Sequence, residues 1–302
     1  MKISGFSFVK NAVKLYYPVE ESIRSILPLC DEFIIAVGKG EDNTREVIES
    51  IGDPKIRIID TVWDPAETKQ GLVMSNQTNL ALKECTGDWC FYVQADEVVH
   101  EDDLPLIRSR CEKLQGNKHV EGILFNYLHF WGDYDHYQKS HGWYPREIRI
   151  VRNGIGVKSV RDAQSFRIAD DKKLTVASSG ARIFHYGCVR PPYLMQNKQK
   201  TFKTLYVGKQ AMENMFKSEP EEFDYGPLNV LPRYTNTHPK VMAERIQNCD
   251  WKHLLHEENR PDVSIQRKPH KHERIKNRLL TVIEQSTGLD FNHKNWKKLL
   301  NV

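Results

Sequence analysis

The stretch Trp89-Cys90-Phe91-Tyr92-Val93-Gln94-Ala95-Asp96-Glu97 joins a continuous apolar run to the acidic loop 94–103. Residues 89–93 have the pattern of a strand that is buried on both faces of a parallel sheet. The acidic loop then follows the carboxyl end of that strand. Open α/β sheets bind their ligands in the crevice outside the carboxyl ends of the strands. The stretch therefore predicts a ligand site, with the carboxylate of Asp96 in it.

The residues before this stretch alternate between strand and helix patterns. Asn43 with Glu46 forms a capping-box signature for one of the helices. Strands are expected at 3–9, 33–37, 56–59 and 89–93, with helices starting at Pro18, after Asn43 and at residue 73. Four strands separated by helices predict an α/β fold with a doubly wound, mostly parallel sheet.

The pattern changes after about residue 120. Strands are expected at 122–131, 147–152, 172–177 and 182–186, and a helix at 191–217. The basic tail contains an amphipathic helix with Ile275, Leu279, Val282 and Ile283 on one face and Gly288 as its stop. This half predicts a smaller, mixed-strand side of the fold and a helical C-terminal tail.

Composition limits the class of protein. The 302 residues allow one large domain, or one domain with a smaller appendage, and a net charge of +4 is below that of a dedicated nucleic-acid binder. No run reaches the roughly 18 apolar residues that span a bilayer, and no export signal is evident. None of the six cysteines forms a Cys-x-x-Cys pair, so we expect reduced thiols in a cytoplasmic protein.

The acidic loop suggests a particular chemistry. A carboxylate at a strand end can hold a divalent cation, which neutralises the charge that develops on a departing diphosphate. Asp96 is the candidate for that ligand. Glu101, Asp102 and Asp103 have a simpler explanation, as solvated acids or as the start of the next helix.

Several motifs occur in the order that family 2 glycosyltransferases show. They are Asn79-Leu80-Ala81-Leu82, Thr86-Gly87-Asp88-Trp89, Gln94-Ala95-Asp96-Glu97, His141-Gly142-Trp143-Tyr144 with Arg149, residues 162–167, His185-Tyr186-Gly187-Cys188-Val189-Arg190 and Thr237-His238-Pro239. The chain resembles that family over about residues 1–245. The resemblance implies the GT-A fold, a nucleotide-sugar donor and a divalent cation, Mn²⁺ or Mg²⁺.

The resemblance also implies roles on the donor side. Asp96 becomes the metal ligand beneath the diphosphate, and Gln94 stands where the family usually has the first acid of Asp-Ala-Asp-Glu. An amide there can exchange hydrogen bonds but brings no charge. Residues expected to border the nucleotide are Ser4, Phe6, Asn11, Asp42 and Asn79. Gly38 stands where many relatives have an acid that contacts the base.

In the family that the chain resembles, the general base follows the arginine-bearing strand, so the resemblance favours Asp162. An ion pair of Asp162 with Arg161 or Arg167 is the structural alternative, and Asp133 and Asp135 in the aromatic loop are the other candidates for the base.

Further residues have a functional and a structural interpretation. His185 is either a metal contact or a packed histidine. Arg149 and Arg190 either hold phosphate oxygens or form ordinary salt bridges. Trp143 and Tyr144 either stack on a sugar or belong to the core.

Together these features predict a metal-dependent, inverting glycosyltransferase that uses a UDP-sugar and a glycan or lipid-linked acceptor. A nucleotide-sugar half (1–120), an acceptor half (121–245) and a basic helical extension (246–302) are expected. Lys271, Arg274, Lys276 and Arg278 either lie on a solvated face or contact anionic lipid at the inner face of the membrane. A non-catalytic sugar-binding scaffold and a nucleotidyltransferase are the alternative functions.

Overall fold

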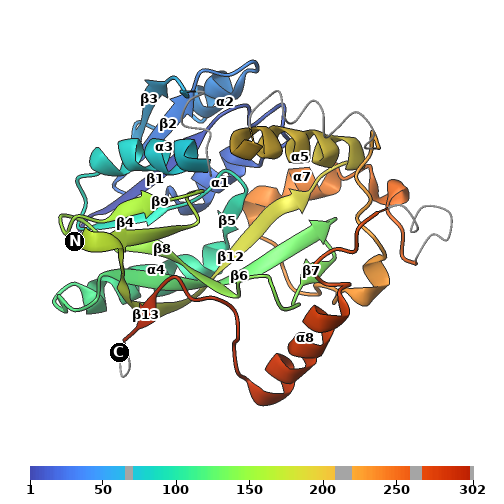
Figure 1. Cartoon of the computed structure of the whole chain (residues 1–302). Coiled ribbons are helices and arrows are strands. Elements are labelled where there is room, and N and C mark those ends of the chain that lie inside the picture. Colours follow the sequence, from blue (N-terminus) through green and yellow to red (C-terminus); the bar gives the residue numbers. More distant parts are fainter. Residues whose placement is uncertain (65–70, 208–219, 259–266, 300–302) are drawn as a thin grey trace.

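The computed structural model describes residues 1–64, 71–207, 220–258 and 267–299. Four parallel strands form one half of its main sheet (Figure 1). They are β1 (Ile3–Val9), β2 (Glu32–Gly38), β3 (Ile56–Thr61) and β4 (Trp89–Tyr92), in the spatial order β3-β2-β1-β4. The predicted parallel sheet is confirmed. Its carboxyl edge carries the loops that follow Val9, Gly38 and Tyr92.

The other half of the sheet has mixed strand directions, as predicted. β4 pairs antiparallel with β8 (Arg146–Arg152), β8 pairs antiparallel with β6 (Gly122–Gly132), and β6 runs parallel to β12 (Thr175–Val189). Three short strands complete the sheet: β5 (Glu97–Val99) and β13 (Lys297–Lys298) pair with β12, and β7 (Tyr137–Gln138) pairs with β6.

The prediction of separate strands at 172–177 and 182–186 is wrong. One strand, β12, covers residues 175–189 without a break. Its pairing with β6 changes register between Ser178 and Arg182, so the polar residues there stay within the strand. Only β11 (Lys172–Lys173) precedes it. This strand joins β9 (Lys158–Val160) and β10 (Ser165–Ile168) in a small second sheet.

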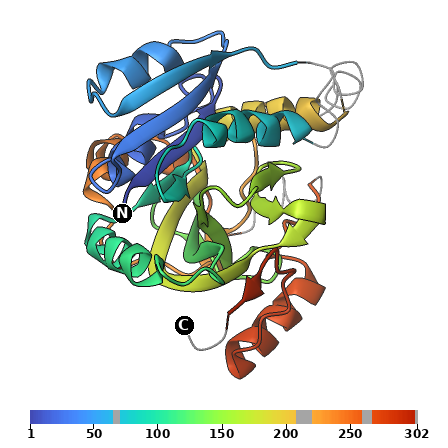
Figure 2. The ribbon, with the colours of Figure 1, turned by 90° about the vertical axis from the view of Figure 1, so that its left-hand side faces the viewer.

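Helices cover both faces of the parallel half (Figure 2). Ile23 of α1 (Val19–Ile26), Ile48 of α2 (Thr44–Ser50) and Ile107 of α4 (Leu104–Leu114) share one apolar core with Phe91. Residues of α3 (Leu72–Lys83) pack in the other core, on Tyr92. This arrangement confirms the doubly wound topology.

The start of α2 differs from the predicted capping box. Asn43 makes no side-chain cap bond. Asp42 Oδ1 instead accepts hydrogen bonds from the backbone N–H of Thr44, at 3.2 Å, and from its hydroxyl, at 2.7 Å. The carboxylate of Asp42 therefore holds the turn after β2 in place.

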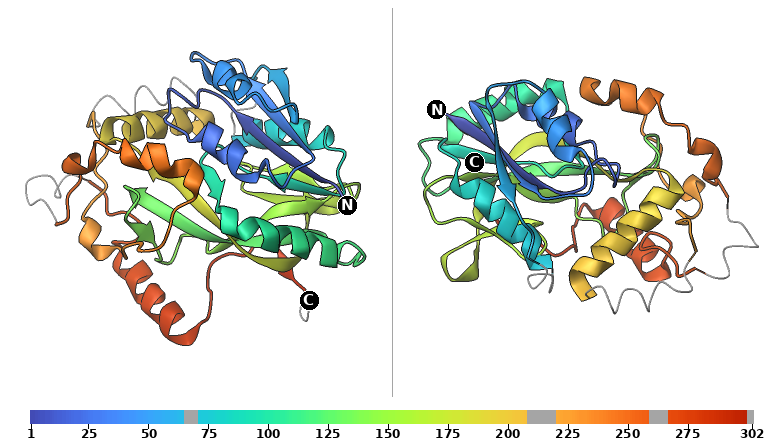
Figure 3. Two further views of the ribbon diagram at one scale, coloured as in Figure 1. Left: turned by 180° about the vertical axis from the view of Figure 1, so that it is seen from behind. Right: turned by 90° about the horizontal axis from the view of Figure 1, so that it is seen from above.

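The C-terminal part wraps around the mixed half (Figure 3). It contains α5 (Pro192–Val207), α7 (Ala243–Gln247) and α8 (Ile275–Thr287). The end of the predicted helix 191–217 lies outside the described residues. Gly288, with φ of 71°, ends α8 as predicted. Single 3₁₀ turns lie at Glu101–Asp103, Ala169–Asp171, Leu228–Val230, Lys240–Met242 and Lys252–Leu254. Among the described residues, no helix combines the length and hydrophobicity needed to cross a membrane.

Candidate active site

Asp96 lies in the loop between β4 and β5, at the carboxyl edge of the sheet, and its residue is only 8% exposed. Its backbone carbonyl accepts a hydrogen bond from Tyr186 N at 2.8 Å, which fixes the loop against β12. Its Oδ2 lies 3.3 Å from Lys198 Nζ and 3.7 Å from His185 Nε2. Burial opposes ionisation, but the charges of Lys198 and His185 outweigh it and hold the pKa of the carboxyl well below its usual range. The site therefore contains a buried, ionised carboxylate.

A chain of hydrogen bonds orients His185. His129 Nε2 lies 2.8 Å from the carbonyl oxygen of Tyr144, so this nitrogen must carry a proton and donate. Burial, followed by repulsion from His185, holds the pKa of His129 well below its usual range, which leaves the ring neutral and its Nδ1 an acceptor. His185 Nδ1 lies 3.0 Å from this Nδ1 and donates to it. The remaining nitrogen of His185, Nε2, then faces Asp96 Oδ2.

The 3.7 Å gap between His185 Nε2 and Asp96 Oδ2 is too long for a hydrogen bond, and both atoms can serve as ligands of a cation. Gly187 keeps that space open, because a Cβ there would lie 2.6 Å from His185 Nε2 and 2.8 Å from Asp96 Oδ2. Imidazole and carboxylate are ligands for Mn²⁺ and related divalent ions. The residues therefore fit a divalent cation, with Asp96 and His185 as protein ligands and water or phosphate in the remaining positions.

Two further cationic groups surround the carboxylate. Lys198 Nζ also donates to the carbonyl of Gly187 at 2.6 Å, and burial lowers the pKa of this ammonium. Arg190 is fully buried and donates to the same carbonyl at 3.0 Å. The ring of Tyr17 contacts both groups, with its centroid 4.8 Å from Arg190 Cζ and 4.9 Å from Lys198 Nζ. The segment after β1 therefore reaches the Asp96 site.

Gln94 contacts the turn that carries Asp162. Gln94 Nε2 lies 3.4 Å from the carbonyl oxygen of Ala163 and 3.3 Å from the hydroxyl of Tyr92. Asp162 is half-buried between Arg161 and Ala163, which have φ of 56° and 60°. Left-handed backbone costs a non-glycine residue about 1–2 kcal/mol. Such strain is concentrated at functional sites, which supports a functional role for this turn.

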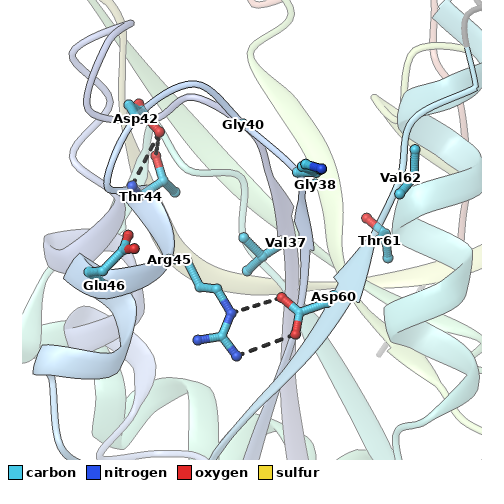
Figure 4. Close-up of a pocket in the computed structure, with 11 residues that line it drawn as sticks. Val37, Gly38, Gly40, Asp42, Thr44, Arg45, Glu46, Asp60, Thr61 and Val62 are labelled. Carbon is cyan, nitrogen blue, oxygen red and sulfur yellow. Dashed lines mark hydrogen bonds and ion pairs between the residues drawn. The ribbon is translucent and has the colours of Figure 1, made fainter.

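A cavity of about 370 Å³ lies farther along the same edge, at the carboxyl ends of β2 and β3 (Figure 4). Asp42 lines it, and the ion pair of Arg45 with Asp60, at 2.8 Å, crosses it. Asn11 Oδ1 accepts from Glu41 N at 2.7 Å, which joins the segment after β1 to the cavity loop. Gly38 has no room for a side chain, because its Cβ would lie 2.4 Å from Trp63 Nε1.

The comparison with known families decides what kind of site this is. Glycosyl transferase family 2 matches residues 17–167, which is half of the chain and includes Asp96 and Asp162. The chain belongs to glycosyl transferase family 2. The predicted family, the enzyme class that it defines and the GT-A type of α/β fold are confirmed.

Solved structures similar to this family 2 chain include S. aureus TarS 1–349 in complex with UDP, at 14% identity and a TM-score of 0.42 over 71% of this chain and 69% of that one. A longer S. aureus TarS matches at 16% identity and a TM-score of 0.41, and the match covers 71% of this chain and 42% of that one. Glucosyl-3-phosphoglycerate synthase from Mycobacterium tuberculosis, with Mn²⁺, UDP and phosphoglyceric acid, matches at 19% identity and a TM-score of 0.31 over 42% and 43% of the two chains. No curated protein matches the family 2 chain.

The structure places three predicted donor residues away from the family 2 site. Ser4 lies at the amino end of β1, where its hydroxyl donates to Glu32 Oε1 at 2.5 Å. Phe6 is fully buried, with its ring centroid 5.2 Å from that of Tyr92. The amide of Asn79 is paired with the backbone of Ser159, at 3.0 and 2.7 Å, and so ties α3 to β9. The predictions of nucleotide contact for Ser4 and Phe6 are wrong, since β1 starts at Ile3 and its amino end faces away from the ligand edge. The side chain of Asn79 therefore links α3 to β9.

The two arginines differ. Arg149 is fully buried, and Nε and Nη2 each donate to Glu97 at 2.7 Å. Its Nη1 donates to the carbonyls of Ile148 and Gln164. Of the two interpretations of Arg149, the structure favours the internal salt bridge over phosphate binding. Arg190 does lie beside Asp96, where its charge helps to keep the carboxyl ionised.

The aromatic candidates lie beside His129. Tyr144 and Trp143 pack on His129, with ring centroids at 4.6 and 5.1 Å. Both are partly exposed, and Trp143 Nε1 is buried without a hydrogen-bond partner. Asp133 is only 4% exposed and bonds to His136 Nδ1 at 2.9 Å, whereas Asp135 pairs with Lys252 at 2.7 Å.

Four residues of the site were not predicted as such: Tyr17, His129, Gly187 and Lys198. Gly187 stood inside a recognised motif, so its lack of a side chain was the available signal. The other three had no signal of their own, because strand pairing or helix packing brings them to Asp96. In the described part of the chain, one group of three side chains that could bind a metal has its ligand atoms within 4.8 Å of one another. It consists of His100, Glu101 and Asp102. Glu101, Asp102 and Asp103 form the turn that starts α4, as their simpler explanation predicted.

Proposed function

We propose that this chain is a metal-dependent, inverting glycosyltransferase that moves a sugar from a nucleotide diphosphate, UDP in the first instance, to a glycan or lipid-linked acceptor. The observation that carries the proposal is the shared space between His185 Nε2 and the Asp96 carboxylate, which Gly187 keeps open. It lies at the carboxyl edge of the sheet in a member of glycosyl transferase family 2.

Asp96 and His185 would hold Mn²⁺ or Mg²⁺, and the ion would supply the positive charge that neutralises the departing diphosphate. Lys198 and Arg190 add fixed positive charge on the same side. Preorganised charges in a partly dry site stabilise developing negative charge better than water does, because they need no reorientation. The cavity beside Asp42 and the loop of Asn11 are suited to the nucleoside end of the donor.

Asp162 would take the proton of the acceptor hydroxyl while the acceptor oxygen bonds to the anomeric carbon and the bond to the diphosphate breaks. Asp133, which lies 2.9 Å from His136 Nδ1, and Asp135, which pairs with Lys252, are the other candidates. Trp143 and Tyr144, next to His129, would contact the sugars on the acceptor side.

Calorimetric titration with UDP, in Mn²⁺ and in chelator, tests the donor site. Asp96→Asn should abolish turnover and remove the metal-dependent part of UDP affinity, because the ion loses its charged ligand. Asp170→Asn is the matched control, since the Asp170 side chain is 83% exposed in the turn before β11. Metal-dependent affinity that survives Asp96→Asn contradicts the proposal. Donor that binds without any slow hydrolysis or transfer favours the scaffold alternative.

Asp162→Asn tests the base separately. Donor affinity should stay near the wild-type value, while kcat falls by a factor on the order of 10²–10⁴, as for the loss of a general base. The same two measurements on Asp133→Asn and Asp135→Asn are the controls. A near-native kcat in Asp162→Asn, with loss in either control, would place the base in the aromatic loop.

A further inference from the structure

Helix α8 is attached to the rest of the protein through its polar side. His141 N donates to Thr281 Oγ1 at 2.8 Å, and His141 Nδ1 lies 3.1 Å from Glu284 Oε1. Asn277 Nδ2 donates to the carbonyl of Lys271 at 2.8 Å. Positions 277, 281 and 284 share one face of a helix because they are four and three residues apart. That face is the one turned toward the protein.

The apolar stripe of α8 faces solvent. Ile275, Leu279, Val282 and Ile283 are 77%, 62%, 64% and 44% exposed. After the helix, Leu289 and Phe291 are also more than half exposed, at 57% and 52%. A surface helix of a globular protein normally turns its apolar stripe toward the core. In α8 this orientation is reversed, and Figure 1 shows the helix at the periphery of the molecule. A contiguous apolar surface of this kind marks an interaction site.

The charges around the stripe indicate what it contacts. Helical spacing of about 100° per residue places Lys276 beside Ile283 at one border and Arg278 beside Val282 at the other. Lys271 and Arg274 are exposed just before the helix. Residues 267–298 contain nine Lys and Arg and three acids, a net charge of +6 in a chain whose total is +4, so the remaining residues sum to −2. The positive charge is thus concentrated in the C-terminal part of the chain that carries the stripe.

We propose that α8 is an interfacial helix that binds the surface of an anionic lipid bilayer, with Ile275, Leu279, Val282 and Ile283 inserted between the headgroups. An apolar stripe with basic borders has the chemistry of membrane-surface helices. A second copy of this chain fits less well, because pairing two such stripes would bring their basic borders together. A nucleic acid would leave the aliphatic side chains exposed to water.

The position of α8 connects it to the active site. The loop that anchors α8, His141–Tyr144, also supplies the carbonyl of Tyr144 that orients His129. Lys271 Nζ donates to the carbonyl of Gly142 at 3.2 Å in the same loop. An acceptor carried by a lipid would therefore meet the enzyme on the side of Trp143 and Tyr144. This consequence for the acceptor rests on the proposed function, whereas the membrane contact does not.

Vesicle co-sedimentation of the full chain tests the proposal without any sugar nucleotide. The wild-type protein should bind vesicles of phosphatidylcholine mixed with phosphatidylglycerol and should not bind pure phosphatidylcholine. Each basic residue at an anionic surface contributes roughly fivefold in affinity. Lys276→Glu with Arg278→Glu should therefore lower binding by at least about tenfold, and added salt should lower wild-type binding. Lys113→Glu with Lys118→Glu, an exposed pair elsewhere, is the matched control and should bind with wild-type affinity.

Leu279→Ser with Val282→Ser tests the apolar stripe and should also lower vesicle binding by at least about tenfold. Because both side chains are exposed, the melting temperature should not change, and Leu106→Ser, on an exposed site of α4, is its control. The proposal is overturned if the wild type does not bind anionic vesicles or if the α8 variants bind as it does. It is also overturned if the wild type is a dimer in sedimentation velocity, the α8 variants are not, and the wild type does not bind vesicles. Vesicle binding in a protein that fails to transfer sugar would contradict the proposed function alone.

Discussion

Asp96 and Glu97 are neighbours in sequence and both are buried, but their carboxylates are held in opposite ways. Glu97 receives two hydrogen bonds of 2.7 Å from Arg149 and one of 2.7 Å from the hydroxyl of Tyr127. Asp96 has Lys198 at 3.3 Å and His185 at 3.7 Å. The first cluster uses its donors and acceptors internally. The second holds its groups loosely, around a space that a cation can enter.

This difference separates a structural carboxylate from the proposed metal ligand. Alternation along the chain turns Glu97 into β5 and toward Arg149, while Asp96 precedes the strand and stays at the edge. A saturated buried ion pair is hard to break but offers nothing to a ligand. An ionised carboxylate with long contacts can exchange its partners. The contrast therefore predicts that substitutions at the two positions affect different properties.

The largest effect is expected for Glu97→Gln, in the free energy of unfolding. The amide keeps the shape but leaves the buried charge of Arg149 without a partner, which should cost about 3–5 kcal/mol. In Asp96→Asn the ammonium of Lys198 keeps its hydrogen bond of 2.6 Å to the carbonyl of Gly187, so this change should cost less by at least about 2 kcal/mol. Urea unfolding of both variants measures the difference. Equal losses would show that the two carboxylates are not distinct, and recovery in the pair Glu97→Gln with Arg149→Met would confirm the ion pair as the cause.

The next effect concerns the orientation of His185. His129→Leu removes the acceptor that fixes His185 Nδ1–H, so the affinity for Mn²⁺ should fall by roughly 10–100-fold, as for the loss of a partner behind a metal ligand. His129→Asn keeps an acceptor near the same place and should lose less. Electron paramagnetic resonance of Mn²⁺ measures the affinity, and nitrogen NMR of the metal-free protein reports the tautomer of His185. If both variants lost the same affinity for Mn²⁺ and the tautomer of His185 did not change, His129 would have only a packing role.

Lys198→Met should have a smaller effect of opposite sign. The ammonium and an incoming cation compete for the same oxygen of Asp96, so its removal should raise the affinity for free Mn²⁺ by roughly three- to tenfold. Lys113→Met, on the exposed surface of α4, is the control for a change in net charge. An unchanged or weaker affinity would mean that Lys198 does not compete with the ion.

The smallest effect is expected at Gln94. Gln94→Asp restores the acid that is usual for the family and removes only the hydrogen bonds of 3.3 and 3.4 Å. The variant should fold, remain active and bind Mn²⁺ about two- to threefold more tightly. Activity assays and Mn²⁺ titration check both parts. Complete loss of activity in a folded variant would reveal a contact that only an amide can make.

The sequence was informative where a signal is local. Continuous apolar runs predicted the four parallel strands, and the position after β4 predicted the place of Asp96 at the ligand edge. The same local reasoning misplaced Ser4 and Phe6, because both lie within β1 and before its carboxyl end. The actual loop begins after Val9 and contributes Asn11 and Tyr17.

The remaining parts of the site depend on long-range pairing. The register that places His129 opposite His185 arises from two parallel strands far apart in sequence. Lys198 reaches Asp96 from α5, about a hundred positions later in the chain. Neither contact leaves a pattern in the residues around it. The polar interruption at residues 178–182 hid the continuity of β12 for a similar reason, since only the partner strand shows that the register can shift.

The cationic surroundings of Asp96 have a kinetic consequence. A free divalent ion that approaches this carboxylate meets the charges of Lys198 and Arg190, and Gln94 adds no negative charge to offset them. A nucleotide-diphosphate sugar carries two negative charges, so its complex with a divalent ion is neutral and is not repelled by these groups. In the proposed mechanism the ion would therefore enter together with the nucleotide sugar.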